Sequence, residues 1–148
     1  MNSRNSLRVL ERVGDIAMLA GFKGRIDGEH MHFALGIGLD DGRSQMVYVR
    51  DVSRSADRQI ITVFSPCLVR KKGFWKGISK ELAIRLLRRN EAVHFARYGI
   101  CELEKADMIV ASMDHLLETL DPPELEASVF HVALAADTLE REHGQDTF

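Results

Sequence analysis

The stretch Leu120-Asp121-Pro122-Pro123-Glu124-Leu125 decides how the chain is organised, because it predicts the start of a long closing helix over residues 120–142. Asp121 can accept hydrogen bonds from the free N–H groups of a first turn, and Pro122 suits the first helical position, where a missing N–H costs nothing. Apolar residues then recur at three- and four-residue spacing, which makes one stripe that needs a surface to lie on. The stripe consists of Leu125, Val129, Val132, Ala133, Ala136 and Leu139, with Glu126, Asp137, Glu140 and Arg141 off it.

The residues before this helix predict strands that supply such a surface. Helical spacing also marks residues 7–20, which Gly21 ends, and residues 79–89, which Ser79 caps and Asn90 stops. Alternating apolar residues predict strands at 31–39, 45–52, 59–68, 93–103 and 107–113, with 22–29 as a loop. Pro66 cannot donate a ladder hydrogen bond, so the third strand either ends there or lies at an edge.

The predicted order is α-β-β-β-α-β-β-α. Short turns between consecutive strands favour antiparallel pairing, with helices packed against the sheet. We therefore expect an α+β, two-layer fold with a mostly antiparallel five-stranded sheet. The length of 148 residues suits one domain, which we take as residues 1–148.

The sequence also carries information on the cellular location of the protein. No apolar run approaches the ~18 residues of a membrane-spanning helix, and the N-terminus is a poor signal peptide. Cys67 and Cys101 sit in apolar stretches without a second pair, which predicts buried free thiols. These features together predict a cytoplasmic protein with no membrane contact.

The formal net charge of -2 hides a strong asymmetry. Residues 70–89 hold eight basic residues against one acidic residue, whereas residues 102–148 hold twelve acidic residues against two basic ones. Such a division can steer a partner or align a second copy of the chain.

The basic segment contains the most unusual local sequence, in which Phe74 and Trp75 lie among positive charges. One interpretation is a binding loop for an acidic peptide or for single-stranded nucleic acid. The other is a solvated loop whose aromatic residue covers the end of the sheet. Phe130 and Leu134 also widen the apolar arc of the closing helix, which indicates a second contact such as a dimer partner. The candidate partner-binding residues are Arg70, Lys71, Lys72, Phe74, Trp75, Lys76, Phe130 and Leu134.

The sequence offers little evidence of a catalytic or metal-binding motif. There is no glycine-rich phosphate loop and no Cys-x-x-Cys or His-Glu-x-x-His spacing. His30 and His32 would share one face of a strand, and a small hydrolase or metal enzyme would require them to converge with a carboxylate such as Glu29 or Asp27. A surface pair at a strand end is the simpler interpretation. We therefore expect no catalytic residues, no cofactor and no metal.

The element order and the closing stretch resemble a known group. The element order resembles the class I type III secretion chaperone fold and the related bacterial YbjN family. The closing stretch looks similar to YbjN-like proteins, with two strands, the Leu120-Asp121 entry and a helix containing Val132-Ala133-Leu134-Ala135-Ala136-Asp137. The resemblance implies a small cytoplasmic bacterial protein without catalytic activity, commonly a homodimer. Chaperones of this fold hold an extended segment of a secreted protein against apolar patches.

These observations lead to one leading expectation and one alternative. The first is a non-enzymatic, homodimeric module that binds a protein or peptide partner. The alternative is a nucleic-acid-associated protein that works through residues 70–89. It predicts that Lys71, Lys72, Phe74 and Trp75 cluster on one exposed face.

Overall fold

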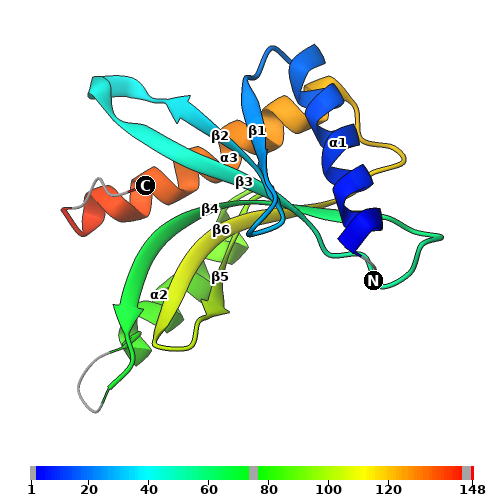
Figure 1. Cartoon of the computed structure of the whole chain (residues 1–148). Coiled ribbons are helices and arrows are strands. Elements are labelled where there is room, and N and C mark those ends of the chain that lie inside the picture. The colour runs from blue at the N-terminus through cyan, green and yellow to red at the C-terminus, as the bar shows by residue number, and fades with distance from the viewer. Residues whose placement is uncertain (1–2, 74–76, 145–147) are drawn as a thin grey trace.

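A computed structural model describes residues 3–73, 77–144 and 148 of the chain (Figure 1). Within these residues the six strands form one sheet in the order β1-β2-β3-β4-β6-β5, and all neighbouring strands are antiparallel. The elements are α1 (Ser3–Leu19), β1 (Gly24–Asp27), β2 (His32–Gly38), the 3-10 turn η1 (Asp40–Gly42), β3 (Ser44–Asp51), β4 (Ile60–Lys71), α2 (Lys80–Ala92), β5 (Arg97–Glu102), β6 (Ala106–Leu116) and α3 (Pro122–Glu142).

The α+β class and the antiparallel pairing are confirmed, but the predicted number of strands was wrong. The segment taken as a loop contains β1, which pairs with β2 from Gly24 opposite Leu35 to Asp27 opposite His32. This strand escapes sequence patterning because it has four residues, of which only Ile26 is apolar. Its place in the sheet comes from β2 beside it and from α1, which packs against it.

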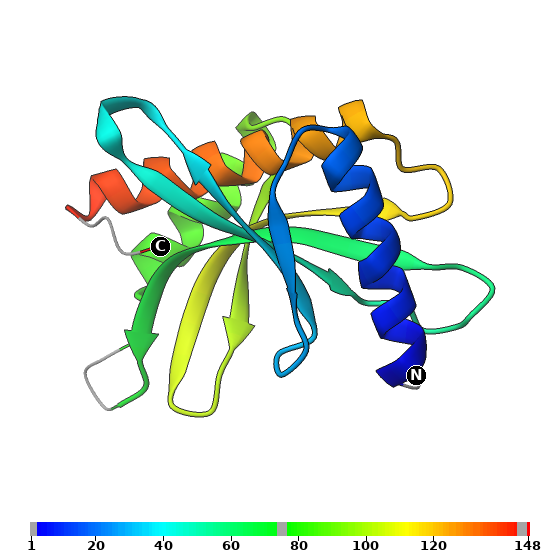
Figure 2. The same cartoon turned by 45° about the horizontal axis from the view of Figure 1, so that its top comes forward.

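The start of α3 and its apolar stripe are confirmed. Asp121 caps the helix by accepting a hydrogen bond from the backbone N–H of Glu124 at 2.7 Å. All six residues of the predicted stripe are buried, and α3 crosses the sheet over β3, β4 and β6 (Figures 1 and 2). Full burial of each Leu or Val side chain contributes roughly 1.5–3 kcal/mol, so this stripe holds the two layers together.

Burial alternates along the strands and gives the sheet two different faces. Phe33 and Leu35 of β2 and Val47 and Val49 of β3 are buried against the helices. The residues that alternate with them along these strands point to the other face, where the described helices do not pack. We call this second surface the helix-free face.

Pro66 lies inside β4, which is a central strand, so neither predicted placement was right. It pairs with Val110 of β6, and the register shifts between Pro66 and Leu68 at a bulge. The ladder between β3 and β4 stops at Phe64. The Pro66 carbonyl accepts a hydrogen bond from the side chain of Gln45, which belongs to β3. Because the N and carbonyl O of a strand residue point to the same side, the Pro66 N atom also faces β3. The β3–β4 ladder has already ended there, so the missing N–H of Pro66 costs no ladder hydrogen bond.

Several helices and strands begin or end at residues other than the predicted ones. Ser79 caps α2 as predicted, but the helix continues past Asn90, whose side chain instead bonds the backbone of Tyr98. β5 begins at Arg97 rather than at residue 93, while β4 extends to Lys71 and takes in part of the segment expected to be a loop. Leu87, expected on the inner face of its helix, is exposed.

Two acidic residues of α3 that fall off the apolar stripe are nevertheless buried. Asp137 forms an ion pair with Arg43, next to η1, and a second one with Arg141 at 2.7 Å. Glu140 Oε2 lies 3.9 Å from Arg43 Nη2. The ion pairs thus fasten the end of α3 to the turn between β2 and β3.

In the described part of the chain, no helix is long and apolar enough to span a membrane.

Candidate functional site

The predicted basic segment is divided among different elements. Arg70 and Lys71 form the end of β4, and Lys72 follows it directly. Phe74, Trp75 and Lys76 lie outside the described residues. The predicted cluster of basic and aromatic side chains therefore stays a prediction.

Part of the charge asymmetry is neutralised within the chain. Lys72 Nζ lies 2.8 Å from the carboxylate of Glu102 and 3.9 Å from that of Asp107. Arg89 of α2 is 2.7 Å from Glu142 at the end of α3. The acidic half of the chain thus offsets some of the positive charge that the nucleic-acid alternative requires.

Phe130 and Leu134, which lie off the main apolar stripe, are exposed on α3. Their exposed fractions are 40% and 52%. Phe130 contacts Phe22 with ring centroids 6.0 Å apart, and the neighbouring His131 stacks on exposed Phe95 at 4.7 Å. The outer side of α3 thus carries apolar and aromatic side chains.

An apolar groove between α2 and β5 was not predicted. Its volume is about 220 Å³. Leu87 and Ile100 stand at it with exposed fractions of 69% and 57%. Among the described strands, β5 pairs with β6 alone and is an edge strand of the sheet. We call this feature the α2–β5 surface, lined by Ile78, Ala83, Leu86, Leu87, Tyr98, Gly99 and Ile100.

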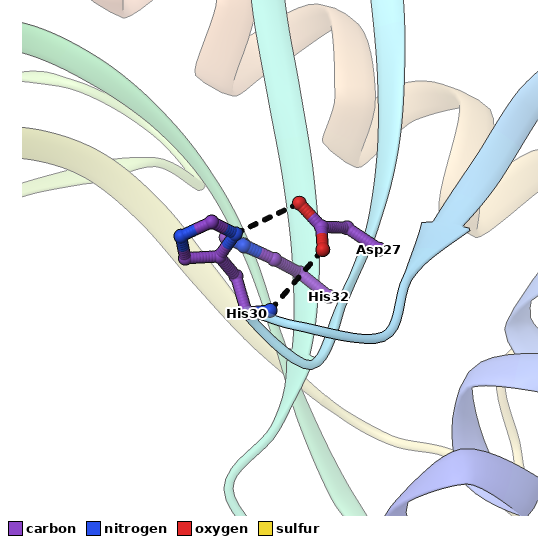
Figure 3. A group of neighbouring side chains, drawn as sticks. All are labelled: Asp27, His30 and His32. Carbon is purple, nitrogen blue, oxygen red and sulfur yellow. Dashed lines mark hydrogen bonds and ion pairs between the residues drawn. The ribbon is translucent and has the colours of Figure 1, made fainter.

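A second arrangement lies at the turn between β1 and β2, where Asp27, His30 and His32 converge (Figure 3). One potential ligand atom from each residue lies within 4.8 Å of the others. His30 Nδ1 and Asp27 Oδ2 are 2.9 Å apart, and the rings of His30 and His32 have centroids 5.5 Å apart. The two histidines therefore converge with a carboxylate, which is that of Asp27.

The backbone explains this convergence. Asp27 ends β1 and His32 begins β2, and the two residues are direct cross-strand partners. Between them, Met31 adopts a positive φ of 54°, which turns the chain sharply. Asp27 Oδ1 accepts hydrogen bonds from the backbone N–H groups of Glu29 and His30, which fixes the carboxylate.

The electrostatics of the three groups differ. The hydrogen bond with His30 lowers the pKa of Asp27, and the same bond raises the pKa of His30. Partial burial lowers the pKa of His32, so that this ring favours its neutral form. His32 is therefore able to offer a nitrogen lone pair near neutral pH.

Aromatic side chains continue from this cluster along the helix-free face. The ring of His32 lies 5.0 Å from that of Tyr48, which in turn lies 5.5 Å from Phe64. The guanidinium of Arg50 sits over Phe64 at 5.1 Å. These residues line an open cavity of about 500 Å³ beside the histidines. The alternation along residues 45–52 was the sequence signal that placed Tyr48 and Arg50 on one face, but only pairing with β1 brings Asp27 to it.

The two cysteines have different environments. Cys67 is a buried free thiol, as predicted, and burial raises its pKa well above the ordinary value. Cys101 is free but only partly buried, at the cavity on the helix-free face. Its place on edge strand β5 leaves it less covered than the sequence predicted.

The fold defines the class of this protein as α+β, with an open six-stranded antiparallel sheet that carries helices on one face. No protein-family model matches the chain, and no curated protein matches it. The arguments for function therefore rest on the surfaces described above.

Proposed function

We propose that this chain is a non-enzymatic protein-binding module that works as a homodimer. The observation that supports it best is the α2–β5 surface, where apolar side chains stand exposed beside an open strand edge. The layout that resembles class I type III secretion chaperones and the YbjN family supports the same class, although the sheet has one strand more than that layout.

A second copy of the chain is the occupant that suits the α2–β5 surface. β5 carries Arg97 at one end and Glu102 at the other, with Ile100 between them. When two β5 strands approach antiparallel about a two-fold axis, the positive end of each lies near the negative end of the other. The same axis brings Leu87 and Ile100 of both copies together, so their apolar surface leaves water.

The partner in this proposal is a protein or peptide held by the dimer. The apolar side of α3 at Phe130 and Leu134 supports contact with apolar segments, because exposed patches of this kind mark interaction sites.

The test is the molar mass in solution, measured by light scattering at micromolar concentration. We expect a mass near twice 16.7 kDa for the wild type. The double variant Leu87→Glu with Ile100→Glu should give the monomer mass, because two charges per copy cannot be buried in the interface. Leu134→Glu is the matched control, since Leu134 is comparably exposed but lies on α3.

Two results would contradict the proposal. One is a wild type that remains monomeric throughout the concentration range. The other is a dimer that dissociates with Leu134→Glu but not with the double variant. Far-UV circular dichroism of all variants checks that each one is folded.

A further inference from the structure

We propose that Asp27, His30 and His32 form a binding site for one divalent late-transition metal ion, with Zn²⁺ as the representative ion. This inference is independent of the proposed homodimer, because the three residues belong to the turn between β1 and β2. The α2–β5 surface belongs to other elements at the opposite edge of the sheet.

The ligand set fits such an ion in kind and in number. Zn²⁺ binds imidazole nitrogens and carboxylate oxygens at about 2.0–2.2 Å, and two histidines with one carboxylate are a common set of three protein ligands. Imidazole favours Zn²⁺, Cu²⁺ and Ni²⁺ over Mg²⁺ and Ca²⁺, which prefer oxygen ligands. The remaining coordination positions would be taken by water.

The distances fit as well. Ligand atoms around tetrahedral zinc lie about 3.3 Å apart, given the bond lengths above. The corresponding atoms in this cluster are 2.9 Å apart for Asp27 and His30 and within 4.8 Å for the whole set. The His30 side chain is 63% exposed, so its ring can rotate to close the remaining gap without disturbing the core.

The surroundings hold two of the ligands in place. Asp27 Oδ1 is occupied by two backbone N–H groups, which leaves Oδ2 directed toward the histidines. His32 is packed against Tyr48 on the sheet, which restricts its ring. Such fixed orientation lowers the cost of assembling a metal site.

Isothermal titration of the full chain with Zn²⁺ alone tests the proposal. We expect about one ion per chain with a dissociation constant in the micromolar range, as suits three ligands at a partly exposed turn. His30→Ala, His32→Ala and Asp27→Asn should each weaken binding by at least about tenfold, since even changes outside the ligand set cost ~10–100-fold. His94→Ala is the matched control, because His94 is an exposed histidine outside the cluster.

A second readout separates this site from adventitious binding. Zn²⁺ should shift the imidazole nitrogen resonances of His30 and His32 in NMR spectra and leave those of His94 unchanged. Three results would overturn the proposal: no binding below millimolar Zn²⁺, affinity that is unchanged by Asp27→Asn, or a stoichiometry of one ion per two chains.

Discussion

At the scale of single residues, Asp137 joins parts of the chain that are far apart in sequence. Its carboxylate contacts Arg43, 94 residues earlier, and Arg141, one helical turn later. Burial on its own raises the pKa of Asp137, but the hydrogen bonds from the two arginines outweigh it, and the net effect lowers the pKa. This carboxylate is therefore stabilised in its charged form.

Replacing Asp137 with Asn should destabilise the fold by about 2–3 kcal/mol at neutral pH. This is less than the ~3–5 kcal/mol for breaking a fully buried pair, because Arg141 is partly solvated. Urea unfolding followed by circular dichroism measures the difference. Glu126→Gln is the control on an exposed position of α3 and should change stability by less than about 0.5 kcal/mol. A loss as small as that of the control would show that the ion pairs add nothing to stability.

The Asp137 carboxylate also makes the free energy of unfolding depend on pH in the acidic range. Since its pKa is lower in the folded chain than in the unfolded chain, its stabilisation is complete above the ordinary aspartate pKa of about 3.9. It is lost as the pH falls below that value through the folded-state pKa. The gap in unfolding free energy between the wild type and Asp137→Asn should therefore narrow below about pH 4, and a gap that is constant with pH would contradict an origin in the two arginine contacts.

At the scale of secondary structure, β1 depends on the absence of a side chain at Gly24. A Cβ atom at this position would lie 2.3 Å from Cζ of Phe33 and 2.9 Å from the carbonyl oxygen of Ala34. Gly24→Ala should therefore push β1 away from β2 and cost about 1–3 kcal/mol, as overpacking typically does. Thermal unfolding measures this cost.

Gly28→Ala is the matched control for that substitution, because a Cβ atom there meets no atom within 4 Å. We expect it to change stability by less than about 0.5 kcal/mol. Equal effects of the two substitutions would show that the packing of β1 on Phe33 is not the reason for the glycine. Gly24→Ala should also weaken Zn²⁺ binding, because Asp27 is carried by the same strand.

The elements that sequence patterns predicted are those defined by local chemistry. The cap at Asp121 and the stripe of α3 depend on residues within a few positions of each other, and both are confirmed. β1 and the interior position of Pro66 depend instead on neighbouring strands, and the sequence around them contains no sign of that pairing. Burial of Asp137 depends on its contact with Arg43. The two residues are so far apart in the sequence that no local pattern predicts this contact.

The candidate metal site was predictable only in part, for the same reason. The two-residue spacing of His30 and His32 is visible in the sequence, but His30 lies in the turn before β2 rather than on the predicted strand face. The third residue of the cluster comes from β1, the strand that the apolar pattern does not reveal. The α2–β5 surface was not predicted because helical spacing placed Leu87 on the buried face of its helix. In the structure Leu87 is exposed, since β5 is a short edge strand that does not cover it.

At the scale of the whole molecule, the sheet is covered unevenly. The described helices pack on one face, and the opposite face carries the aromatic residues beside the histidines. The proposed dimer contact lies at one edge of this sheet and the proposed metal site near the other edge. Zn²⁺ binding should therefore leave the molar mass unchanged, and the dimer-breaking variant should bind Zn²⁺ as the wild type does.

The position of α3 in the chain also constrains how the protein is made. Every strand is synthesised before the helix that covers the centre of the sheet, so the part of β3, β4 and β6 that α3 buries stays uncovered on the ribosome until residues 125–139 have emerged. A nascent chain at that stage exposes aggregation-prone apolar surface. Completion of the core must therefore follow the synthesis of α3, and a ribosome stalled just before Asp121 should hold a chain that proteases digest readily.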